Sequence, residues 1–176
     1  MNRIENWDNV TPIMGGFQAL PAGAYKVKVL NAYESHSKSG NEMLVLEIDI
    51  CEGEFKGYFA NQFENKKKFN DQAKWPCNYY QLTSGDERNI GRYKGLTMAF
   101  EQSNMDYHWD FNEASLKGLV AGCIFREEEY FGNDKKIHSN CKPMQIIPVD
   151  DIASARVPEK KKLEQNAEED YGAIPW

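Results

Sequence analysis

Residues 24–50, AYKVKVLNAYESHSKSGNEMLVLEIDI, decide the fold of this chain. Between 24 and 34, apolar side chains alternate with lysines, which is the period-two pattern of a half-buried strand. Ser, Lys, Gly and Asn dominate residues 35–41 and favour a turn. From Met43 to Ile50 every even-numbered position is apolar, so a second strand follows. The stretch therefore predicts an antiparallel β-hairpin.

The rest of the chain predicts a mainly β domain built around this hairpin. A short turn after Ile50 leads to a third strand near Phe55 to Phe63. Residues 64–88 are Lys-rich, contain a proline and predict a long loop or insertion, and residues 89–102 have the apolar spacing of a short helix. Gly118 to Tyr130 and Ile137 to Val149 predict a closing hairpin. Three strands, a helix and a hairpin are the element order of a five-stranded OB-fold barrel, although other small barrels share it.

Length and composition predict one globular domain with two tails. The chain has 176 residues, of which 41% are hydrophobic. We expect an N-terminal arm at 1–22, an OB-fold domain at 23–157 and a disordered acidic tail at 158–176. Because no apolar run approaches the roughly 20 residues of a membrane helix, we expect a soluble, cytoplasmic protein. Four widely spaced cysteines without a Cys-x-x-Cys motif predict reduced thiols.

The charge is segregated along the chain. The net charge is −6, but residues 164–176 hold four acids and no Lys or Arg, so the remaining body is only −2. Residues 56–94 carry eight basic and four acidic side chains, whereas residues 101–134 carry two basic and eight acidic ones. A cationic surface is therefore compatible with the acidic overall balance.

Aromatic and basic side chains interleave between residues 55 and 80. Eight of the 22 aromatic residues fall in this stretch, together with Lys66, Lys67, Lys68 and Lys74. Lysines neutralise phosphates and aromatic faces stack on unpaired bases, which a duplex hides, so this composition is typical of a single-strand binder. The rings at strand-like spacing, Phe55, Phe59 and Phe63, are expected in the core. Both roles stay open for Trp75, Tyr79 and Tyr80.

The first hairpin adds further cations. If Val27 and Val29 face the core, Lys26 and Lys28 project outward, and Lys38 lies in the turn beyond them. OB folds bind strands on this surface, but outward lysines also protect a strand from edge pairing. The candidate residues for binding single-stranded DNA are Lys26, Lys28, Lys38, Tyr58, Lys66, Lys67, Lys68, Lys74, Trp75, Tyr79 and Arg92.

Catalysis and metal binding have little support in the sequence. His138 and Cys141, with Cys123 or Cys77, would be needed for a zinc site, and no paired ligand motif backs them. The three consecutive glutamates at 127–129 point to alternate faces of a strand and cannot all line one site. We therefore expect a protein that is not an enzyme and has neither a metal nor a cofactor.

The last residues form a docking peptide. Glu169 and Asp170 precede a small-residue spacer and the apolar end Ile174, Pro175 and Trp176. An aromatic can fill a pocket, the terminal carboxylate can meet an Arg or Lys, and the acids can steer the approach to a basic rim. The alternative is a frayed terminus with an accidental Trp.

Several motifs resemble a phage family long regarded as of unknown function, whose members are taken to be OB-fold single-stranded DNA-binding proteins of phages that infect Gram-positive bacteria. They are LPAGAYKVKV at 20–29, SKSGN at 37–41, RYKGL at 92–96 with EQSN at 101–104, and LKG at 116–118 leading to EEEY at 127–130. The resemblance covers roughly residues 7 to 163. Separately, the C-terminal tip is similar to that of bacterial single-stranded DNA-binding proteins, which end in Ile-Pro-Phe after an Asp-rich run. Trp176 replaces that Phe.

The residues and the two resemblances together predict a non-catalytic protein that coats single-stranded DNA in the cytoplasm of an infected host. The resemblances imply a role in phage DNA replication, recombination or repair, with replication and recombination proteins as partners of the tip, and they leave a homo-oligomer open. One alternative is a recombination mediator or protein-recruitment module that does not bind DNA. Another is a glycan-binding module that uses Trp75 and Tyr79.

Overall fold

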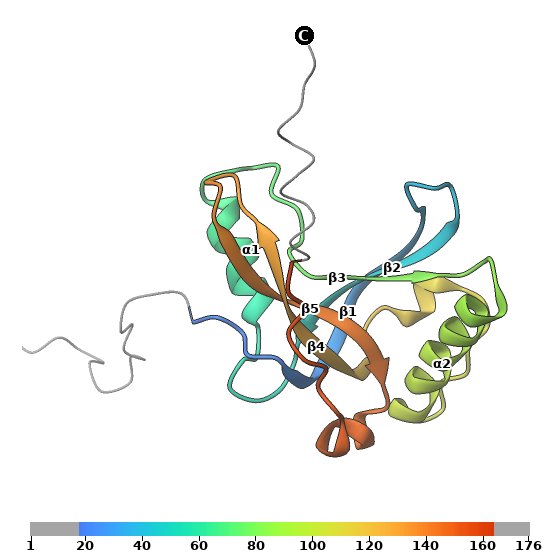
Figure 1. The fold of residues 1–176 in the computed structure, drawn as a ribbon. Coiled ribbons are helices and arrows are strands. Elements are labelled where there is room, and N and C mark those ends of the chain that lie inside the picture. Colours follow the sequence, from blue (N-terminus) through green and yellow to red (C-terminus); the bar gives the residue numbers. More distant parts are fainter. Residues whose placement is uncertain (1–17, 164–176) are drawn as a thin grey trace, which may run out of the picture.

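The computed structural model describes residues 18–163, which form a mainly β protein around a five-stranded antiparallel sheet in the order β3-β2-β1-β4-β5 (Figure 1). The strands are β1 (Gly23–His36), β2 (Glu42–Ile50), β3 (Asn78–Leu82), β4 (Val120–Phe131) and β5 (Ile137–Ile147). The helices are α1 (Tyr58–Lys67) and α2 (Glu87–Ser103), with 3-10 turns η2 (Glu113–Leu116) and η3 (Val149–Ser154). Within residues 18–163, no helix is long and apolar enough to cross a membrane.

β1 is the central strand and pairs along both of its edges. It pairs with β2 over most of its length and with β4 from Gly23 to Lys28. Backbone hydrogen bonds join Val29 to Gly118 and Leu119, and there β1 leaves β4. At the same point the register with β2 shifts between Val29 and Asn31. Such a bulge bends the strand and exchanges the side chains that face the core.

The core lies on the inner face of the sheet and is closed by the two helices. Phe59 of α1 stacks on Phe125 of β4 with ring centroids 5.8 Å apart. At the other end of the sheet, α2 buries Leu96, Ala99 and Phe100 in the core. Figure 1 places α1 and α2 at opposite ends of the sheet, which leaves the outer face of β1, β2 and β3 between them without a helix.

The predicted third strand near 55–63 is wrong, because this segment forms α1. Gly57 adopts a left-handed conformation (φ 73°) that turns the chain into the helix. The buried Asp49 carboxylate on β2 then accepts hydrogen bonds from the backbone N–H groups of Phe59 and Ala60 at 2.9 and 3.2 Å. Apolar residues four apart fit one face of a helix as well as one face of a strand.

The third strand instead lies inside the segment predicted as a long loop at 64–88. α1 continues to Lys67, β3 occupies Asn78–Leu82, and α2 begins at Glu87. β3 pairs with β2, where Tyr80 lies opposite Val45 and Tyr79 opposite Leu46. Residues 18–163 therefore contain two α-helices and not the one expected. The predicted helix at 89–102 is confirmed as α2, and the other four strands are confirmed as β1, β2, β4 and β5.

The expectation that the chain is disordered beyond Pro158 does not hold up to Leu163. Lys161 forms a parallel bridge with Glu128 of β4, and its backbone bonds to Glu127 and Glu129 are both 2.9 Å long. Lys160 lies 3.0 and 3.1 Å from the carboxylates of the same two glutamates. A basic run thus pairs with an acidic run along an open strand edge, which sequence patterning did not indicate.

We predict that replacing Asp49 with Ala destabilises the protein by about 1–3 kcal/mol, because buried N–H groups at the start of α1 lose their acceptor. The free energy of unfolding is measured in urea by circular dichroism. Asp71→Ala, an exposed position, is the control and should have a midpoint close to that of the wild type. An Asp49→Ala midpoint equal to that of the wild type would contradict this role.

Candidate functional site

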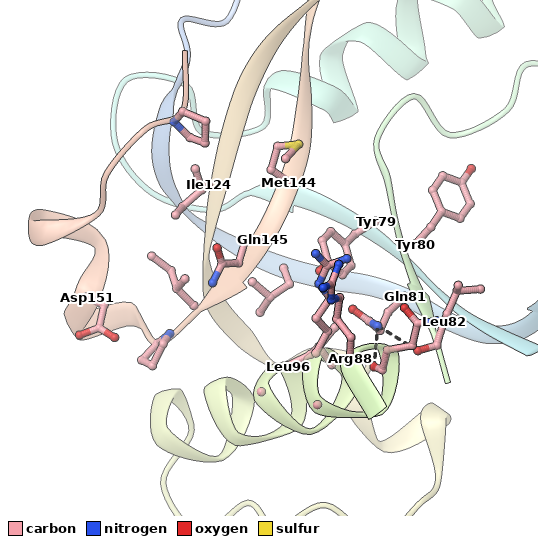
Figure 2. Close-up of a pocket in the computed structure, with 18 of the residues that line it drawn as sticks. Tyr79, Tyr80, Gln81, Leu82, Arg88, Leu96, Ile124, Met144, Gln145 and Asp151 are labelled. Carbon is pink, nitrogen blue, oxygen red and sulfur yellow. Dashed lines mark hydrogen bonds between the residues drawn. The ribbon is translucent and has the colours of Figure 1, made fainter. Parts of the chain in front are cut away.

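A groove with a volume of about 900 Å³ lies where β3 and β5 approach each other beside α2 (Figure 2). Its walls come from β3, the first half of α2, the end of β5 and the segment that follows η3. In Figure 2, Arg88 rises from α2 beside Tyr79, whereas Tyr80 projects away from the groove floor. The groove lies beside the outer face of the sheet, which no helix covers.

Three arginines line this groove: Arg88, Arg92 and Arg156. Among the described residues that line the groove, Asp151 is the only acidic one. Within residues 18–163, none of the three guanidinium groups forms an ion pair. Like charges repel each other when they are gathered in a concave surface without counter-charges, so this arrangement is typical of an anion-binding site.

α2 presents Arg88 and Arg92 one turn apart on the same face. Asp86 caps the N-terminus of the helix, and its Oδ1 accepts a hydrogen bond from the Asn89 N–H at 2.9 Å. Gly91 and Gly95 also line the groove, and a Cβ atom at either position would meet nothing within 4 Å. Each glycine costs roughly 1 kcal/mol of helix stability relative to Ala. The two glycines thus leave bare backbone beside the arginines at a cost to the helix.

The floor of the groove is fixed by buried polar side chains. Gln81 is buried, and its Nε2 donates to the carbonyl oxygens of Leu82 and Asn89 at 2.9 and 3.4 Å. Burial raises the pKa of Tyr79 to about 12, although the Arg92 charge and a hydrogen bond with the Ile146 backbone act in the opposite direction. Tyr79 is therefore a neutral phenol at physiological pH.

An aromatic ledge borders the groove on the outer face of the sheet. It consists of Tyr33, Val45 and Tyr80, which lie in one row across β1, β2 and β3. Tyr33 is 40% and Tyr80 58% exposed, while Val45 between them is 2% exposed. Burial, Glu47 and Tyr80 raise the pKa of Tyr33, so the two phenols are close enough to influence each other. Tyr80 belongs to both the ledge and the groove.

A separate cationic region surrounds the end of α1. A hollow of about 700 Å³ is lined there by Lys66, Phe69, Lys74 and Trp75 among others, and it shares no lining residue with the groove. Lys67 lies 5.7 Å from the Phe63 ring centroid, and Lys68 donates to the Asn65 side chain.

Trp75 has a structural role in this region. Its indole N–H donates to the Ile48 carbonyl at 3.0 Å, and its ring lies 5.3 Å from that of Phe63. One side of Trp75 therefore belongs to the core, while its other side lines the hollow.

The remaining candidate residues lie apart from the groove. Lys26 pairs with Glu52 at 3.4 Å, and Lys28 and Lys38 are exposed on β1 and in the turn after it. Tyr58 packs against the core, and its hydroxyl oxygen accepts from the Leu20 N–H at 3.0 Å. Of the predicted DNA-binding residues, the structure thus brings Tyr79 and Arg92 together in the groove. The predicted docking residues Glu169, Asp170, Ile174, Pro175 and Trp176 lie outside the described residues.

Sequence reasoning missed three prominent residues of this surface: Tyr33, Arg88 and Arg156. Strict alternation places Tyr33 inside with Val27 and Val29, and only the bulge after Val29 turns it outward. Arg88 lies four residues before Arg92, and this spacing on a predicted helix was a usable signal. No local pattern singles out Arg156.

Of the residues considered for a metal site, His138 is engaged by another side chain and the cysteines are free thiols. His138 contacts both carboxylate oxygens of Asp134 at 2.8 and 2.9 Å. Cys77 and Cys123 are buried, which raises the pKa of each thiol, and burial raises that of Cys141 to about 11. Within residues 18–163, no group of three or more His, Cys, Asp or Glu side chains is arranged to hold a metal ion.

Residues 8–105 match the model of a family described as a protein of unknown function, DUF669. The match covers more than half of the chain, including β1, β2, β3 and both α-helices, and so it contains the ledge and two of the groove arginines. No curated protein matches the chain.

We predict that Tyr79 makes stability fall in alkaline solution. Its pKa is 10 in the unfolded chain and about 12 in the fold, so its contribution is complete below pH 10 and is lost as the pH rises toward 12. The difference in unfolding free energy between the wild type and Tyr79→Phe should decrease by about 2 kcal/mol between about pH 9 and pH 11.5. Urea unfolding at several pH values measures it, and a constant difference would contradict a buried, protonated Tyr79.

Proposed function

We propose that this chain, which belongs to the DUF669 family, binds single-stranded DNA without sequence preference along the aromatic ledge and the arginine groove. The observation that carries the proposal is the contact between these two features: Tyr80 is part of both. Single-strand binders combine a cationic path for the backbone with aromatic faces for the bases. In this protein the cationic path and the aromatic faces meet at Tyr80 on β3.

The groove supplies the contacts to phosphates. Arg88, Arg92 and Arg156 have no carboxylate partner among the described residues, so a phosphodiester would not have to displace one. Each phosphate contact releases condensed counterions, and binding therefore weakens as salt rises. The bare backbone at Gly91 and Gly95 gives a strand room to approach α2 closely.

The ledge supplies the stacking contacts. Tyr33 and Tyr80 expose their rings on either side of the buried Val45. Stacking of a base on an aromatic side chain contributes roughly 1–3 kcal/mol and tolerates any base. A duplex does not offer free base faces, so the ledge favours single strands. Lys28 and Lys38, exposed on β1 and in the turn after it, are further candidates for phosphate contacts.

The same proposal assigns the sheet to an OB-type barrel. The order β3-β2-β1-β4-β5, with α2 between β3 and β4, supports this assignment, as does the proximity of β3 and β5. OB folds bind oligonucleotides on the face of strands 2 and 3, which is where the ledge lies. The proposed role is non-catalytic coating of single strands in phage replication or recombination, with the C-terminal tip recruiting partner proteins.

We predict distinct effects for arginine and tyrosine variants in titrations of oligo-dT followed by tryptophan fluorescence. Replacing Arg88, Arg92 or Arg156 with Ala should weaken binding and lower the slope of log affinity against log salt by about 0.7 each. Replacing Tyr33 or Tyr80 with Ala should cost about 1–3 kcal/mol and leave that slope unchanged, because stacking releases no counterions.

Lys94→Ala is the matched control, because Lys94 lies on α2 but does not line the groove. Its affinity and salt slope should stay close to those of the wild type. If the wild type does not bind oligo-dT even in low salt, the proposal fails and the recombination mediator or recruitment module becomes the better hypothesis. Equal affinity for duplex and single strand would also contradict it.

A further inference from the structure

We infer that copies of this chain associate head to tail, with the segment after α2 of one copy docked at the end of α1 of the next. The contact joins two features that the DNA site does not use. One is an acidic knob, Phe111 with Glu101, Asp106, Asp110 and Glu113. The other is a basic hollow, the cavity lined by Lys66, Phe69, Lys74 and Trp75. This contact does not depend on the proposed function. In a protein that binds single-stranded DNA, it places neighbouring copies along one DNA strand.

The acidic knob presents an aromatic ring to solvent in a constrained conformation. Phe111 is 82% exposed and has a φ of 62°, which L-residues with large side chains rarely adopt. The turn is held by Asp110, whose Oδ1 accepts from the Asn112 N–H at 3.1 Å and from the Ser115 hydroxyl at 3.3 Å. An exposed ring held in an unfavourable backbone conformation points to a binding role.

The segment that carries this ring has charge of one sign. Residues 101–113 contain four acidic side chains and no Lys or Arg. Met105 in the same segment is exposed as well. A partner must therefore offer an apolar hollow with a basic rim.

The basic hollow has these properties. Its volume is about 700 Å³, and its apolar walls include Trp75, Pro76 and Phe69, which is 92% exposed. Lys66 and Lys74 line it, and Lys67 and Lys68 complete the basic run at the end of α1. A buried aromatic anchor in a pocket with a charged rim is the usual centre of a specific protein contact. The acidic knob and the basic hollow are thus complementary in charge, and each offers apolar surface to the other.

Their positions determine the kind of assembly. Figure 1 shows α1 and α2 at opposite ends of the molecule, and the acidic knob directly follows α2. A copy therefore does not fill its own hollow, and the acidic knob must meet the basic hollow of another copy. A contact between two different surfaces gives a ring of subunits if its rotation closes and an open chain if it does not, and the open chain is the assembly that we infer. An open chain suits a protein that covers a strand of any length.

Charge-reversal variants of the full chain test this contact by sedimentation velocity at low salt without DNA. The pair Asp106→Lys and Glu113→Lys cancels the net charge of the acidic knob, and the pair Lys66→Glu and Lys74→Glu cancels that of the four lysines around the basic hollow. The wild type should form a concentration-dependent series of species, and each variant alone should stay monomeric. An equimolar mixture of the two variants should associate into a dimer, because the unchanged basic hollow of the first variant meets the unchanged acidic knob of the second.

Phe111→Ala tests the anchor without changing charge, and Phe131→Ala, another exposed Phe, is its control. Phe111→Ala should raise the concentration for half association by about tenfold or more, and Phe131→Ala should not change it. A monomeric wild type, or a mixture that does not associate, overturns the inference. If Lys66 and Lys74 instead bind DNA, their reversal weakens binding to an oligo-dT of about 12 nucleotides, and mixing restores nothing. Failure to bind oligo-dT with intact association would reject the proposed function alone.

Discussion

The structure depends on the way β1 is held between β2 and β4. Where both partners are present, β1 buries Val27 and Val29 on one face of the sheet. Where β4 leaves at Leu119, the register shift exchanges the faces, so that Ala32 turns inward and Tyr33 outward. One irregularity thus bends the sheet and creates half of the aromatic ledge. The other half follows from strand pairing, because Val45 of β2 lies opposite Tyr33 of β1 on one side and opposite Tyr80 of β3 on the other.

Several locally unfavourable choices coincide at the groove. Two glycines weaken α2, three arginines gather without acidic partners among the described residues, and Tyr80 exposes a large ring. Each of these choices costs stability or solubility, and none is needed to bury the core. In most proteins the local preferences of the residues agree with the fold, and the exceptions occur mainly at functional sites. The concentration of such features around the groove is therefore the physical basis for our proposal that DNA binds there.

The sequence predicted the elements whose signal is local and missed those that depend on distant contacts. The alternation in β1, β2, β4 and β5 and the apolar spacing of α2 were sufficient. α1 was mistaken for a strand because Phe55, Phe59 and Phe63 fit either period, and the decisive partner, Asp49, lies ten residues before the Phe59 N–H that it accepts from. β3 was missed because it lies in a segment whose lysines and proline predicted a loop. Of the site, Tyr79 and Arg92 were identified, but Tyr33 requires knowledge of the bulge.

The central claim is that bases of a single strand lie on Tyr33 and Tyr80. Photo-crosslinking with a halogenated deoxyuridine oligonucleotide, followed by mass spectrometry of the peptides, tests this most directly, because zero-length adducts form on aromatic rings that stack on the base. Adducts on Tyr33 and Tyr80, competed away by unlabelled oligo-dT and not by duplex, are the predicted result. Adducts confined to Phe69 and Trp75 at the end of α1, with none on the ledge, would contradict the account.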